Sequence, residues 1–264
     1  MQILPTATYL GNTSATCQAN GIWTSVTCYT RENLPNVSLH AHANPHVTVL
    51  LAGATLEKRQ GEEHYRQAGE AVFFHAGEPH ENSRTMPGSR NFNIEFAPDF
   101  FAAYGVGEEK IGEAINRNPL AALAFLRAYC HLSHDGLLAG DSIAMAVIGL
   151  MDRHCRVCRQ PPQWVRQVSE LLQDRWNEQV GLQELSIETG VHPVTISRYF
   201  SRYFGGTLSD YMRKLRVKNT LTMIKNTPYT LTRIAYEAGF TDQAHFTKVF
   251  KEVTGFLPKE YRAA

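Results

Sequence analysis

The last third of the chain contains the same pattern twice, and this internal repeat limits what the sequence can fold into more than any other feature. The two blocks are residues 182–204 (LQELSIETGVHPVTISRYFSRYF) and 231–253 (LTRIAYEAGFTDQAHFTKVFKEV). When Gly190 is aligned with Gly239, apolar residues match on both sides of the glycine. Each block predicts a helix, a turn with glycine and a second helix, which is the helix-turn-helix pattern. One such block also fits an ordinary helical bundle, but two in register favour the repeated motif.

The spacing within each block predicts which residues face inward. A small residue, Ser186 or Ala235, lets the two helices cross closely, and the glycine adopts a positive φ at the turn. The second helix then buries an apolar triplet, which is Ile196, Tyr199 and Phe200 in the first block and Phe246, Val249 and Phe250 in the second.

The opposite face of each second helix is therefore expected to be exposed and suited to the major groove of DNA. Glutamine pairs with adenine, arginine pairs with guanine, and small apolar groups contact the thymine methyl. The candidate DNA-contacting residues are Val194, Thr195, Ser197, Arg198 and Arg202 in the first block and Gln243, Ala244, Thr247 and Lys248 in the second. A basic run (Arg213, Lys214, Arg216 and Lys218) either contacts phosphate or forms a solvated face.

The distribution of charge favours a polyanionic partner for the C-terminal part of the chain only. The 264 residues contain 26 Lys+Arg and 25 Asp+Glu, for a net charge of +1, but residues 160–264 contain 14 Lys/Arg against 10 Asp/Glu. No apolar run is long enough to cross a bilayer, and the first residues lack the basic and apolar stretches of a secretory signal. We therefore expect a cytoplasmic protein without a membrane partner, and we expect its five cysteines to be free thiols.

The N-terminal part has a different pattern of apolar residues. Short apolar or alternating stretches at 23–29, 47–51, 71–74 and 92–96 are separated by Gly, Pro and Asn, which predicts an antiparallel β-barrel or sandwich. Ala- and Leu-rich segments at 107–118, 119–133 and 141–158 then predict helices, and residues 159–163, with Pro161-Pro162, predict a linker. The fold class expected is α+β with two domains: an N-terminal β-barrel with trailing helices, and an all-α C-terminal domain with two helix-turn-helix units.

The C-terminal residues resemble the AraC/XylS family of DNA-binding domains. The resemblance lies in the stretch Ile234–Phe240 (IAYEAGF), followed by Phe246, Phe250, Gly255, Pro258, Tyr261 and Arg262. It implies a bacterial transcription regulator that binds double-stranded promoter DNA and works with RNA polymerase, as a homodimer. Whether it activates or represses is left open. His192 departs from the family, which usually has Ser or another helix cap there.

The histidine-rich N-terminal segment resembles a cupin-type sensor domain. His40, His42, His46 and Gly53 match the first cupin motif, and Gly69, Gly77 and His80 match the second; Leu34 and His75 depart from it. The resemblance implies a cupin-like domain in residues 1–100 that binds an unidentified small-molecule effector. Residues 101–158 are then a helical dimerisation region, with an apolar stripe of Ile143, Val147 and Leu150, and residues 164–264 are the DNA-binding domain.

The same histidines leave a second hypothesis open. His40, His42, His46 and His80 are candidate metal ligands, although regulators of this kind commonly keep such a stretch without a metal. We expect no cofactor and no enzymatic activity. The alternative is a metal-dependent cupin enzyme, or a metal sensor, with a DNA-binding tail. His154, Cys155 and Cys158 form a lone CxxC pattern, for which ordinary packing is the expected role.

Overall fold

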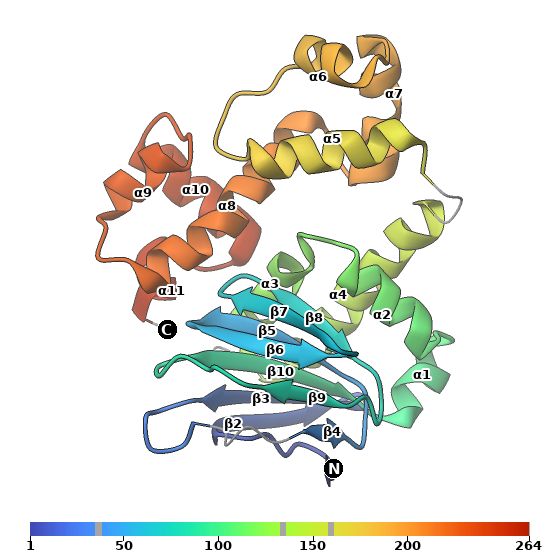
Figure 1. The fold of residues 1–264 in the computed structure, drawn as a ribbon, viewed down its shortest axis with the longest axis vertical. Helices are drawn as coiled ribbons and strands as arrows, with labels where there is room; N and C mark the ends of the chain where they lie inside the picture. Colours follow the sequence, from blue (N-terminus) through green and yellow to red (C-terminus); the bar gives the residue numbers. More distant parts are fainter. Residues whose placement is uncertain (35–38, 133–135, 158–160, 264) are drawn as a thin grey trace.

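The computed structural model has a β-rich N-terminal part and a helical C-terminal part (Figure 1). It describes residues 1–34, 39–132, 136–157 and 161–263. The two-domain α+β architecture expected from the sequence is confirmed. Within the described residues, no helix has both the length and the apolar character needed to cross a membrane.

The N-terminal part is built from two five-stranded sheets. The first contains, in spatial order, β1 (Gln2–Leu4), β4 (His40–His42), β9 (His80–Asn82), β6 (Ala54–Arg59) and β7 (Glu62–Gln67). The second contains β2 (Asn12–Ala19), β3 (Ile22–Cys28), β10 (Arg90–Phe96), β5 (His46–Ala52) and β8 (Ala71–Phe74).

These sheets correct two expectations. Strand pairing among the described residues leaves two separate sheets, so the expected β-barrel is not closed and the sandwich alternative fits better. The arrangement is also not purely antiparallel, because β1 pairs with β4 in parallel. The four predicted strands correspond to β3, β5, β8 and β10 and are confirmed. They all belong to the second sheet, whose longer apolar strands carry the stronger sequence signal.

The second sheet separates polar from apolar side chains by simple alternation. Along β5, Val47, Val49 and Leu51 point to one face, where they join the main hydrophobic cluster. The alternate residues His46 and Thr48 line a cavity that the first sheet also lines. Because successive side chains of a strand point to opposite faces, the sheet has one apolar face and one face that carries polar side chains.

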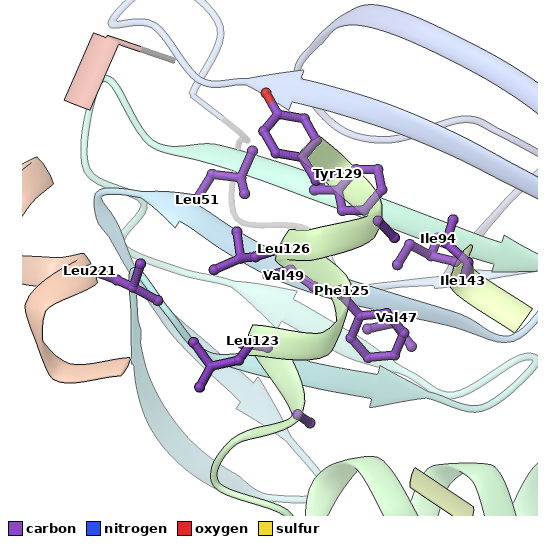
Figure 2. Close-up of a cluster of buried hydrophobic side chains, with 14 of the residues drawn as sticks. Val47, Val49, Leu51, Ile94, Leu123, Phe125, Leu126, Tyr129, Ile143 and Leu221 are labelled. Atoms are coloured by element: carbon purple, nitrogen blue, oxygen red, sulfur yellow. The ribbon is translucent and has the colours of Figure 1, made fainter. Parts of the chain in front are cut away.

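Helices cover the apolar face of this sheet. They are α1 (Pro98–Tyr104), α2 (Glu108–Asn116), α3 (Ala121–Leu132) and α4 (Gly136–Val157). Figure 2 shows α3 lying across the strands, with Phe125 and Leu126 directed to the apolar residues of β5. The helices predicted at 107–118, 119–133 and 141–158 correspond to α2, α3 and α4, whereas α1 was missed.

The stripe expected to pair two subunits is inside the chain. Ile143, Val147 and Leu150 of α4 are at most 2% exposed and belong to the same hydrophobic cluster as α3. The stripe therefore gives no support to a dimer interface. Its burial explains the apolar spacing without a second copy.

The C-terminal part consists of helices joined by short turns. They are α5 (Gln163–Asp174), α6 (Leu182–Thr189), α7 (Pro193–Phe204), α8 (Leu208–Asn226), α9 (Leu231–Glu237), α10 (Gln243–Thr254) and α11 (Pro258–Ala263). The long helix α8 joins the pair α6–α7 to the pair α9–α10 (Figure 1). Of the predicted linker, residues 159 and 160 lie outside the described residues, as does Cys158.

The two parts share one hydrophobic core. Leu221 of α8 packs into the cluster that contains the β5 and α3 residues (Figure 2). Hydrogen bonds tie the same surfaces together: the Tyr261 hydroxyl donates to the Leu51 carbonyl at 2.9 Å, and Thr222 Oγ1 donates to the Ala68 carbonyl at 2.7 Å. The pair α9–α10 is thereby held against the β-rich part.

Replacing Leu221 by Ala is expected to lower the free energy of unfolding by about 2–5 kcal/mol, because it leaves a cavity in this shared core. Chemical denaturation measures the loss. Ile187→Ala, at a side chain that is 82% exposed, is the matched control and should stay within about 0.5 kcal/mol of the parent. Equal effects of the two substitutions would contradict the shared core.

Candidate nucleic-acid interface

The first helix pair forms as the sequence predicts. Helix α6 ends at Gly190, whose φ of 69° is left-handed, and α7 begins after His192. His192 does act as the cap, because its Nδ1 accepts a hydrogen bond from the Val194 backbone N–H at 3.3 Å. Leu185, Ile196 and Phe200 are buried between the helices.

One inward residue was assigned wrongly. Tyr199 is 40% exposed, whereas Val249, its counterpart in the second block, is only 4% exposed. In the first pair, therefore, two residues of the triplet carry the packing, and Tyr199 lies at the edge of the exposed face.

The exposed face of α7 matches the prediction. Ser197, Arg198 and Arg202 are exposed, Val194 is 56% exposed, and Thr195 is half-buried. Among the described residues, the Arg198 guanidinium has no ion pair or hydrogen bond to another side chain. It is therefore free to contact a nucleic acid.

The second pair repeats the geometry with a better cap. The Asp242 carboxylate accepts a hydrogen bond from the His245 backbone N–H at 2.7 Å, at the start of α10. Phe246 and Phe250 are fully buried on the inner side of that helix. The predicted outward residues are in place: Gln243, Ala244 and Lys248 are exposed and Thr247 is half-buried.

A broad depression of about 890 Å³ runs beside α10. It is lined by the four predicted contact residues together with Lys251, Glu252 and Leu257. The Gln243 side-chain oxygen accepts a hydrogen bond from the Thr232 hydroxyl, which leaves the amide N–H₂ of Gln243 free to donate. The depression beside α10 therefore carries a side-chain amide that can donate a hydrogen bond.

The basic run on α8 does not form one phosphate-binding patch. Arg216 donates to the backbone carbonyls of Gly239 and Glu178, at 2.9 and 2.8 Å, and burial lowers its pKa. Lys214 and Lys218 are half-buried, and the exposed Arg213 is paired with Asp210. Arg216 is a structural tether between α8 and the turn of the second pair, a role that the run of charges did not reveal.

The four candidate metal ligands come together elsewhere, between the two sheets. His40, His42, His46 and His80 are each 2–3% exposed, and they line one cavity. Desolvation lowers the pKa of His42 to about 3 and that of His80 to about 4, and neighbouring imidazoles add to the effect. Burial likewise lowers the pKa of His46.

His75 is not part of this group, because its Nδ1 makes a hydrogen bond with the Glu108 carboxylate at 2.8 Å. The side chains of His154 and Cys155 lie outside the described part of the structure.

Comparison with known proteins finds a described domain in the C-terminal helices and relatives along most of the chain. Residues 185–264 match a family model described as a helix-turn-helix domain. The chain is 21% identical over 256 residues to the HTH-type transcriptional activator RhaR of Mannheimia succiniciproducens, covering 90% of this chain and 91% of that one. It is 29% identical over 97 residues to RhaS of the same organism, covering 36% of that protein.

Solved structures include similar chains. A transcriptional regulator with an AraC-type DNA-binding domain from Chromobacterium violaceum is 22% identical, with a TM-score of 0.37, and the match covers 38% of this chain and 89% of that one. ToxT from Vibrio cholerae is 10% identical, with a TM-score of 0.39, and the match covers 92% of this chain and 98% of that one.

The turn glycines provide a test of the second pair. A Cβ on Gly239 would lie 2.1 Å from the Asn177 carbonyl oxygen, whereas a Cβ on Gly190 would meet nothing within 4 Å. Both residues have a positive φ, so Gly190→Ala is expected to cost about 1–2 kcal/mol of unfolding free energy. Gly239→Ala is expected to cost about 4 kcal/mol, because the backbone must also move. Denaturant titrations measure both, and equal losses would show that the Asn177 contact is not rigid.

Proposed function

We propose that this chain is a DNA-binding transcription regulator of the AraC/XylS type that binds promoter DNA through two helix-turn-helix units at once. Helices α7 and α10 are the proposed recognition helices. The observation that carries the proposal is that each helix exposes a face with polar side chains and buries the opposite face through a pair of apolar residues, which are Ile196 and Phe200 in α7 and Phe246 and Phe250 in α10. The residues proposed to contact base edges or the adjacent backbone are Val194, Thr195, Ser197, Arg198, Arg202, Gln243, Ala244, Thr247 and Lys248.

The helix α8 supports simultaneous binding. It packs against both helix pairs, and Arg216 fixes it to the turn that precedes α10. Two recognition helices joined through α8 are proposed to enter two successive segments of the major groove, which lie about 10–10.5 base pairs apart.

The N-terminal part is proposed to control DNA binding. It contacts the second helix pair through α3 and α8, so any change in the second sheet that shifts α3 would reach α10. A ligand can act in this way only if it binds one arrangement more tightly than the other. The relatives are named as activators, and activation in the cytoplasm, with RNA polymerase as a partner, is the output proposed here.

The proposed function assigns a role to each part of the chain. Residues 1–100 are the proposed cupin-like sensor, residues 101–158 hold the sensor and DNA-binding parts together, and residues 164–264 bind DNA. A homodimer is implied by the resemblance alone, since the stripe on α4 is buried. Sedimentation of the full chain measures its oligomeric state.

Arg198→Ala and Gln243→Ala are each expected to weaken specific DNA binding by about 1–3 kcal/mol, or roughly 5- to 150-fold, and to relax base preference at one position. The target sequence is first obtained by selection from random duplexes with the full chain. Fluorescence anisotropy then measures affinity for the selected and the scrambled duplex.

The matched control is Arg117→Ala, directly after α2, which removes the same charge from a side chain that is 70% exposed and lies far along the chain from the helix pairs. Its affinity for the selected duplex should stay unchanged. If both recognition variants behave like this control, α7 and α10 do not read the DNA.

A further inference from the structure

The first residue of α10 is held by a side chain of the helix before it. Gln243 follows the cap residue Asp242, and its side-chain oxygen Oε1 accepts a hydrogen bond from the Thr232 hydroxyl on α9. Thr232 and Gln243 are both exposed. The hydrogen bond therefore joins the two helices of the second pair at the surface, at the end of α10 where a recognition helix contacts base edges.

The helix backbone on both sides of this contact is fixed by packing and capping. Ile234 of α9 and Phe246 of α10 are fully buried. The Asp242 carboxylate caps α10 by accepting a hydrogen bond from its backbone. Two packed helices thus bring Thr232 and Gln243 together, and the hydrogen bond selects one orientation of the glutamine amide.

This orientation decides what the amide can offer to a ligand. A glutamine side chain has an acceptor, Oε1, at one end of the amide and a donor with two protons, Nε2, at the other. In Gln243 the acceptor is turned to Thr232, and within the described ranges no protein group accepts a hydrogen bond from Nε2. Gln243 therefore presents a donor to the depression beside α10, which it lines.

A glutamine held in this way matches a different base from a free one. A free glutamine pairs with adenine, because its oxygen accepts from adenine N6 while its nitrogen donates to N7. That pairing needs both ends of the amide to face the base. Guanine instead presents two acceptors, N7 and O6, at the same edge of the major groove. An amide that turns only its nitrogen to the groove therefore fits guanine better than adenine.

The first helix pair cannot make the same contact. Phe246 is the counterpart of Ile196 in the two blocks, so Pro193 occupies the position of Gln243. The side chain of proline is a hydrocarbon ring without a donor or an acceptor. A preference set by this hydrogen bond is therefore expected under α10 only.

We propose that Thr232 is a positioning residue that makes Gln243 read guanine rather than adenine in the major groove. The inference rests on the proposed function, because it requires α10 to enter the groove. It narrows the sequence-based expectation that glutamine pairs with adenine.

The test uses the full chain and duplexes selected from random sequences. Selection with Gln243→Ala first identifies the base pair that Gln243 contacts, because base preference is relaxed at that position. Fluorescence anisotropy then compares two duplexes that differ only at this base pair. The unsubstituted chain is expected to bind the duplex with guanine at least about 5-fold more tightly than the duplex with adenine.

Thr232→Val removes the hydroxyl but keeps the size and branching of the side chain. It is expected to reduce the preference for guanine to about 2-fold or less, because the released oxygen of Gln243 can then accept from adenine N6. Thr232→Ser keeps the hydroxyl and should retain the preference for guanine. Thr16→Val, at an exposed threonine of β2, is the matched control and should leave the preference unchanged. Circular dichroism checks that each variant folds.

A double variant separates positioning from direct contact. If Thr232 acts only through Gln243, adding Thr232→Val to Gln243→Ala should change the affinity for either duplex no further. An equal loss of affinity from Thr232→Val with and without Gln243 would mean that Thr232 contacts the DNA itself, and it would overturn the proposal.

The proposal is also overturned if the unsubstituted chain prefers any base other than guanine at this position, or if folded Thr232→Val keeps the full preference. In these cases Gln243→Ala still relaxes one position, so α10 remains a recognition helix. If Gln243→Ala relaxes no position at all, the role of α10 in the proposed function fails, and this inference fails with it.

Discussion

The packing of α3 on the apolar face of the second sheet is the contact on which the rest of the structure depends. That face receives Val47, Val49 and Leu51 from β5, and α3 covers it with Phe125 and Leu126 (Figure 2). Strand alternation then sends the intervening side chains, including His46, to the other face, where they must be buried against the first sheet. The same helix also contacts α10 of the second helix pair, so one layer of apolar packing positions both the polar cavity and the proposed DNA-binding surface.

The helix pairs could be predicted well because their signals are local. Caps, turn glycines and apolar spacing all lie within about twenty residues of each other, and tertiary packing agrees with them. The exceptions are residues whose environment is set from elsewhere. Tyr199 was assigned to the interior by analogy with Val249, but it remains partly exposed. Arg216 was expected either to contact phosphate or to lie on a solvated face, but two backbone carbonyls distant in sequence hold it in place.

The β-rich part shows the limit of the same reasoning. The sequence spacing identified His40, His42, His46 and His80 as a group, and the structure does bring these side chains together. Which strands pair with one another, and which sheet each strand joins, depends on a strand order that no local pattern encodes. Phe92 shows this directly, because it packs on Tyr129 of α3, with ring centroids 5.0 Å apart, and does not line the cavity. The cavity instead receives Tyr9 and Glu57, which carried no motif in the sequence.

The central claim is that one chain reads DNA with two recognition helices held at a set separation by α8. The most direct test is a hydroxyl-radical footprint, combined with methylation interference, on the duplex that the full chain selects from random sequences. The account predicts two patches of major-groove contact per bound chain, on the same side of the duplex and about one helical turn apart. A single patch per chain, or binding that selects no sequence at all, would contradict it.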